Sequence, residues 1–191
     1  MANVLIPLAQ GCEELEAVTI IDLLRRADIH VTTASLDIGS QVTPVTASRG
    51  VVLIADSTLD DALTQNYDMV VLPGGLPGAD HLDNDKRIHS LLKKMAAEDK
   101  YTAAICAAPK ILANAKLLEG KSATSYPGVI DQMNLKNTRV KEDAVVCDGK
   151  VITSRGPGTA MEFALTLIET LAGTEKRAQV AAGLLWSHSG A

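Results

Sequence analysis

The chain has 191 residues, 47% of them hydrophobic and only 3% aromatic, and its formal net charge at pH 7 is −5. This length and apolar content predict one domain, residues 1–191, with a sizeable core rather than a disordered chain. The negative charge and the scarcity of aromatic rings argue against a nucleic-acid-binding surface, which needs a basic face and often stacking rings. No apolar run reaches the length of a membrane span, so we expect no membrane segment.

Cysteine and histidine usage argues against a disulfide framework and against a metal site. Cys12, Cys106 and Cys147 are odd in number and widely spaced, which is typical of reduced thiols in the cytoplasm. The first residues include no basic segment of the kind that opens a secretory signal. The histidines, which show no metal-ligand spacing, are His30, His81, His89 and His188. We therefore expect a cytoplasmic protein with no metal ion and no cofactor.

Taken in chain order, strand-like and helix-like segments alternate. Apolar runs and alternating patterns predict strands at residues 4–8, 29–35, 68–72, 102–105 and 122–126. Helical spacing predicts helices at residues 13–26, 58–63, 88–97, 159–171 and 175–185, and another from Pro109 onward. Two hairpins are expected: an edge hairpin of residues 42–46 and 51–54, and one that turns at Asp148-Gly149. The alternation predicts an α/β fold, a mainly parallel sheet with helices on both faces, and functional residues at the carboxyl ends of the strands.

Cys106 lies between a predicted strand and a predicted helix, where a sharp turn is expected. The residues around it are small: Ala103, Ala104, Ala107 and Ala108. Small neighbours on both sides are what a nucleophile elbow needs, here with sulfur in place of a serine oxygen. Backbone N–H groups at the start of the helix would favour the thiolate, which is the reactive form. The alternative is that Cys106 is a small buried hydrophobic residue without chemistry.

Two other turns end strands at the same edge of the predicted sheet. Gly74-Gly75 offers backbone that can approach a ligand closely, and the N–H groups of Gly75 and Ala107 would then form an oxyanion hole, although the same residues also suit a plain turn. Glu13 and Glu14 are expected on a solvated surface, where they complement the helix dipole. Glu16 lies one turn further in; it would raise the thiol pKa if ionised and lower it if protonated.

Six segments, in this order and spacing, resemble the ThiJ/PfpI family. They are residues 11–16, 22–26, 48–49, 71–75, 103–107 and 153–159, which together span nearly the whole chain. The resemblance implies a flavodoxin-like doubly wound sheet and a homodimer. It also implies that Cys106 is a reactive, easily oxidised thiol, Glu16 its protonated partner, and Gly75 and Ala107 the oxyanion donors. Arg26 and Arg49 match arginines near the site and the dimer contact of relatives.

One departure from the family pattern concerns the general base. Members of some branches carry a histidine where this chain has Tyr126 or Ala107. Without that histidine, peptidase activity is not expected, and any dicarbonyl turnover should be slow, because tyrosine is a poor base at neutral pH. Cys12, in the first strand-to-helix turn, is near the expected site but is not assigned a role.

Two functions from different classes are consistent with these features. The first is a stress-response enzyme whose Cys106 thiolate reacts with peroxide, or with dicarbonyls such as methylglyoxal and their early adducts on proteins. The second is a redox-regulated chaperone, in which the cysteine is a sensor and the surface binds damaged or unfolded proteins.

Overall fold

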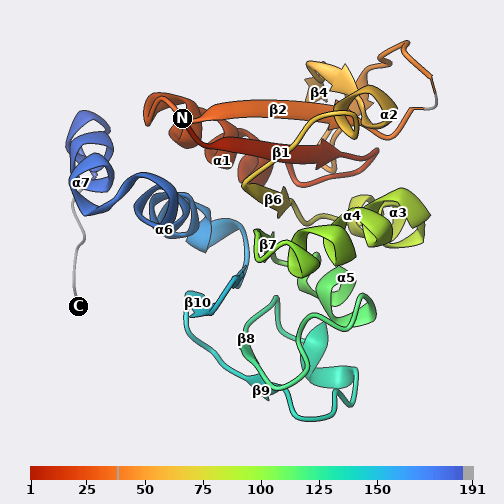
Figure 1. The fold of residues 1–191 in the computed structure, drawn as a ribbon, viewed down its shortest axis with the longest axis vertical. Helices are drawn as coiled ribbons and strands as arrows, with labels where there is room; N and C mark the ends of the chain where they lie inside the picture. Colours follow the sequence, from red (N-terminus) through yellow and green to blue (C-terminus); the bar gives the residue numbers. More distant parts are fainter. Residues whose placement is uncertain (38, 187–191) are drawn as a thin grey trace.

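A twisted, mostly parallel sheet forms the centre of the computed structural model, which describes residues 1–37 and 39–186 (Figure 1). Within these residues it has seven strands in the order β10-β11-β7-β6-β1-β2-β5. The strands are β1 (Asn3–Leu8), β2 (His30–Ser35), β5 (Ser57–Thr58), β6 (Met69–Leu72), β7 (Tyr101–Ile105), β10 (Val145–Asp148) and β11 (Val151–Ser154). All neighbours are parallel except the β10-β11 hairpin. The inner order β2-β1-β6-β7-β11 is the flavodoxin-like arrangement.

Helices cover both faces of this sheet, as the alternation predicted. They are α1 (Glu14–Arg26), α2 (Leu59–Ala62), α3 (Gly78–Asn84), α4 (Lys86–Ala97), α5 (Pro109–Asn114), α6 (Ala160–Ala172) and α7 (Thr174–Gly183). Helices α1 and α6 pack in one core cluster, and α4 and α5 pack in the other; Figure 1 shows α6 across the sheet from α4 and α5. The pleat divides the strands between the clusters, since Val71 of β6 faces α1 and α6 while Val70 and Leu72 face α4 and α5.

The predicted hairpins form, but the predicted strand at residues 122–126 is mostly wrong. The edge hairpin is β3 (Val45–Thr46) with β4 (Val52–Leu53), a two-stranded sheet of its own. Strand β8 (Ser122–Ala123) is only two residues long and pairs with β9 (Arg139–Val140) outside the main sheet. The β10-β11 hairpin takes the sheet edge that this segment would need.

Sequence patterns also missed two elements of the main architecture. Helix α3 contains Gly78, Asp80 and Asn84, all poor helix formers, so its propensity is weak. Strand β5 has two residues, too few for a periodic pattern. Two short 3₁₀ turns, Ile130–Gln132 and Pro157–Thr159, complete the elements. His188 lies outside the described residues.

Across the part of the chain that the structure describes, no helix combines the length and the apolarity needed to cross a membrane.

We predict that Phe163→Ala lowers the free energy of unfolding by about 3–5 kcal/mol, because Phe163 is fully buried in the cluster formed by α1, α6 and the sheet. Urea unfolding followed by circular dichroism measures this change. The control is Leu185→Ala, where the side chain is 91% exposed and the change should stay within about 0.5 kcal/mol. Equal effects of the two substitutions would contradict the assignment of this core.

Candidate active site at the Cys106 turn

Strand register brings three turns together at one edge of the sheet. Leu72 of β6 pairs with Ala104 of β7, and Ile105 of β7 pairs with Ser154 of β11. The Gly74-Gly75 turn and Cys106 therefore follow neighbouring strands directly. The N-terminus of α1 joins them, because the backbone N–H of Glu13 donates to the carbonyl oxygen of Gly74 at 3.0 Å.

Cys106 occupies the sharp turn that the sequence predicted. Its φ of 63° lies in the left-handed region, which residues other than glycine adopt uncommonly. Two backbone hydrogen bonds hold it there: its N–H donates to Ser154 O at 3.0 Å, and its carbonyl accepts the N–H of Tyr126 at 2.9 Å. A strained residue fixed by its surroundings is a frequent feature of functional sites.

Glu16 lies against the Cys106 thiol and is fully buried. Its Oε2 accepts the N–H of Gly74 at 2.9 Å, whereas its Oε1 accepts no hydrogen bond from any other group in the described part of the chain. Gly74 packs closely against the side chains of both Cys106 and Glu16. A Cβ on Gly74 would lie 2.7 Å from Cys106 Cβ and 2.8 Å from Glu16 Oε2, so only glycine fits here.

The carboxyl and the thiol strongly affect each other's protonation. Burial raises the pKa of Glu16 from 4.5 to about 7, although hydrogen bonds from Gly74 N–H and Cys106 act in the opposite direction. Burial, and then the Glu16 carboxylate, raise the pKa of the Cys106 thiol to about 12. The backbone N–H groups of Gly75 and Ala107 favour the thiolate, as expected, but burial and the Glu16 carboxylate outweigh them. Protonation of Glu16 removes the adjacent negative charge and so favours the thiolate.

Two backbone N–H groups point at the sulfur, those of Gly75 and Ala107, and both lower the thiol pKa. Gly75 has φ +87°, and a Cβ there would lie 2.4 Å from Glu13 N. The glycine thus allows the turn to present its N–H beside Cys106. The same pair of donors is suited to an oxygen that becomes negative on a carbon bonded to the sulfur.

A cleft of about 400 Å³ opens above Cys106. Its lining residues are Glu13, Ser48, Arg49, Gly75, Leu76, Cys106, Ala107, Tyr126, Val129 and Pro157. Arg49 and Tyr126 thus lie at the site, as the sequence suggested. Arg26 does not line this cleft; it pairs with Asp22 at 2.8 Å on the exposed face of α1. Cys12 is fully buried, and burial followed by the charge of Glu14 raises its pKa to about 11.

The expectation of a solvated side chain is wrong for Glu14, whereas Glu13 is half-buried and lines the cleft. Glu14 is only 8% exposed, and its carboxylate accepts the N–H of Arg49 at 2.8 Å. Desolvation raises the pKa of Glu14, but hydrogen bonds from Ser48 and from the N–H groups of Arg49 and Val51 outweigh it and leave the pKa below 4.5. Ser48 Oγ lies 2.7 Å from Glu13 Oε2 and 2.9 Å from Glu14 Oε2. The sequence pattern carried no signal for these contacts, which depend on the path of the loop before β4.

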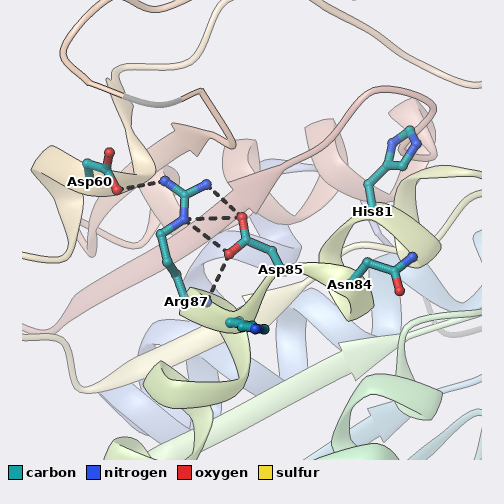
Figure 2. A pocket seen from close by; sticks show the side chains of 6 residues that line it. Asp60, His81, Asn84, Asp85 and Arg87 are labelled. Atoms are coloured by element: carbon teal, nitrogen blue, oxygen red, sulfur yellow. Dashed lines mark hydrogen bonds and ion pairs between the residues drawn. The ribbon is translucent and has the colours of Figure 1, made fainter.

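A larger hollow, about 600 Å³, lies between α2, α3 and the start of α4. Figure 2 shows that Arg87 is already paired there with Asp60 and Asp85, while His81 and Asn84 point elsewhere. This hollow contains no cysteine. The positive charge of Arg87 is neutralised by the carboxylates of Asp60 and Asp85. Among the described residues, no three His, Cys, Asp or Glu side chains gather to hold a metal ion.

Comparison with known proteins defines the family. Residues 2–170 match the DJ-1/PfpI family, and the chain belongs to that family. It is 45% identical over 184 residues to Protein DJ-1 homolog A of Arabidopsis thaliana; the alignment covers 96% of this chain but 46% of that protein, so the chain spans about half its length. The crystal structure of Drosophila melanogaster DJ-1beta is similar with a TM-score of 0.91 and 43% identity, covering 98% of this chain and 99% of that one.

The glutathione-independent glyoxalase DJR-1.2 of Caenorhabditis elegans is 36% identical over 175 residues, which cover 92% of this chain and 90% of that protein.

We predict that the stability of this chain falls between pH 5 and pH 8 because of Glu16. The native carboxyl, with a pKa of about 7, binds a proton that the unfolded carboxyl, with a pKa of 4.5, has already lost. Stability therefore decreases as pH rises through this range, by up to about 3 kcal/mol from this group. Urea unfolding at both pH values should show that Glu16→Gln lacks this decrease. Parallel pH dependence in the two proteins would contradict the burial of a protonated carboxyl.

Proposed function

We propose that this protein is a cysteine-dependent stress enzyme that converts small dicarbonyls to hydroxy acids, and does the same to early dicarbonyl adducts on proteins with release of the protein's amine or thiol. The observation that carries the proposal is the buried Glu16 carboxyl against Cys106, with the N–H groups of Gly75 and Ala107 beside the same sulfur. Support comes from the relative named as a glutathione-independent glyoxalase. Peroxide is a second electrophile that would reach the thiol through the same cleft.

In the proposed first step, Cys106 adds to the aldehyde carbon of the dicarbonyl. Because its pKa is about 7, Glu16 is partly ionised at neutral pH, and the ionised form accepts the thiol proton. The sulfur forms a bond to the carbon, and the carbonyl electron pair moves onto the oxygen. Gly75 and Ala107 N–H groups stabilise that oxyanion, and Glu16 then returns the proton to it, giving a neutral hemithioacetal.

The overall reaction needs no external oxidant. A shift of hydrogen from the aldehyde carbon to the neighbouring carbon converts the hemithioacetal to a thioester, so one carbon is oxidised while the other is reduced. Water then adds its hydroxyl to the acyl carbon and its hydrogen to the sulfur. The net change is one dicarbonyl and one water to one 2-hydroxy acid, with the thiol regenerated.

We predict that the purified protein consumes methylglyoxal, that Cys106→Ala abolishes this activity and that Cys147→Ala leaves it unchanged. Cys147 is the matched control because its thiol is also free but lies in a different hollow, lined by Trp186 and Glu162. Lactate production measures the turnover. Prevention of client aggregation that survives Cys106→Ala, without any methylglyoxal turnover, would instead favour the chaperone.

We also propose that the protein acts as a homodimer in the reducing cytoplasm, where its three free cysteines stay reduced. Exposed apolar side chains gather on α1 and around β4: Leu15, Val18, Val51, Val52 and Ile54. Hydrogen bonds from Arg49 N and Val51 N to Glu14 hold these two segments side by side. Several exposed apolar side chains on adjacent segments are typical of an interface.

Val18→Asp should weaken the dimer by on the order of tenfold or more, because an unpaired charge is costly to bury. Sedimentation velocity across micromolar concentrations measures the change. Val140→Asp is the control, since Val140 is a similarly exposed valine on β9, away from α1. A monomeric wild type, or a dimer that Val18→Asp leaves intact, would rule out this interface.

A further inference from the structure

We propose that Glu13 is the group that moves the proton between the two carbons of the dicarbonyl, and that Ser48 positions it. This inference rests on the proposed function, since it concerns one step of that reaction. It identifies a base in a cleft whose lining residues include Tyr126 but no histidine.

Of the carboxylates near Cys106, Glu13 is the one that lines the cleft. Glu16 lies beneath the sulfur, fully buried and absent from the cleft lining, and Glu14 is turned toward the loop at Arg49. Glu13 is half-buried, with its side chain at the cleft wall. Glu13 is therefore the carboxylate that shares the cleft with a substrate bonded to Cys106.

The backbone of Glu13 is fixed beside the oxyanion donors. Its N–H donates to Gly74 O at 3.0 Å, and its nitrogen would lie 2.4 Å from a Cβ on Gly75. The carboxylate thus extends from the start of α1, which is hydrogen-bonded to the turn that presents the Gly75 N–H. A base held in this way acts on a carbon adjacent to the oxygen that Gly75 binds.

Ser48 gives Glu13 a partner in both protonation states. Its single hydroxyl hydrogen faces two carboxylate oxygens, Glu13 Oε2 at 2.7 Å and Glu14 Oε2 at 2.9 Å. When Glu13 is ionised, the hydroxyl donates to it, and Glu14 still accepts the N–H of Arg49. When Glu13 takes up a proton, it donates to Ser48 Oγ, and the hydroxyl turns to Glu14. The geometry accommodates proton uptake without moving a heavy atom.

The hemithioacetal becomes a thioester by transfer of one proton between its two carbons. Glu13 removes the hydrogen of the sulfur-bearing carbon as a proton, and the freed electron pair forms the carbon–carbon double bond of an enediolate, as the ketone oxygen becomes negative. The hydroxyl proton passes to that neighbouring oxygen, which leaves the negative charge where Gly75 and Ala107 donate. Glu13 then returns its proton to the second carbon, the carbonyl of the thioester forms, and Glu13 is again ionised.

The test compares Glu13→Gln with wild type and with Glu142→Gln, a control at an exposed carboxylate outside the cleft. Glu13→Gln should lower kcat for methylglyoxal by about 10²–10⁴-fold with little change in KM. Its rate of Cys106 alkylation by iodoacetamide should remain that of wild type, which establishes that the turn is intact. The hemithioacetal should accumulate on Cys106, visible by mass spectrometry after rapid quenching.

The kcat values of two Ser48 variants test the positioning role of this residue. Ser48→Ala should lower kcat, but less than Glu13→Gln does. Ser48→Thr keeps a hydroxyl and should therefore restore kcat to the wild-type value. If Ser48 were only structural, kcat would not depend on whether the residue at position 48 has a hydroxyl. If wild type turns over and Cys106→Ala does not, but Glu13→Gln matches wild type, the role of Glu13 is wrong and the proposed function stands. If wild type itself has no turnover, both fail.

Discussion

The contact between the Glu16 carboxyl and the Cys106 thiol imposes the strictest demands on this structure. It places a titratable acid in a fully buried position, where burial raises its pKa to about 7. It also requires that residue 74 have no side chain, because a Cβ there would overlap both partners. The Gly74 N–H, which donates to the carboxyl, limits the cost of burying it.

The parallel sheet meets these demands through register. Each of the strands β1, β6 and β7 ends at the same edge, so α1, the Gly74-Gly75 turn and Cys106 arrive from segments that are distant in sequence. Strand β11 contributes the carbonyl of Ser154, which accepts the Cys106 N–H and holds the left-handed turn. The site therefore depends on the whole sheet rather than on any one loop, and its chemistry is coupled to the stability of the fold.

Much of this architecture was predictable because it follows from local physical constraints. Strands buried on both faces must be apolar throughout, and a sharp turn at Cys106 must have small neighbours, so both leave clear marks in the sequence. The role of Gly74 was visible only as the freedom of a glycine pair. Glycine is required at position 74 because a Cβ there would overlap Cys106 Cβ and Glu16 Oε2, and this contact is visible only in the folded structure.

The features that the sequence did not predict depend on tertiary path. Spacing along α1 cannot tell which acid faces the sulfur and which faces the cleft, because this is decided by where the loop with Ser48 and Arg49 runs. Arg26 lies on the exposed face of α1, where it pairs with Asp22 one turn earlier in the same helix. Strand β8 is short because the β10-β11 hairpin occupies the sheet edge.

We infer that Glu16 keeps a proton beside Cys106 up to about pH 7. Infrared difference spectra of wild type against Glu16→Gln, recorded from pH 4 to pH 9 with ¹³C-labelled glutamate, test it directly. We predict a protonated-carboxyl C=O band that is assigned to Glu16 and disappears with a midpoint near pH 7, in line with its raised pKa. A band that is lost by pH 5, as for an ordinary exposed glutamate with a pKa of about 4.3, would contradict the account.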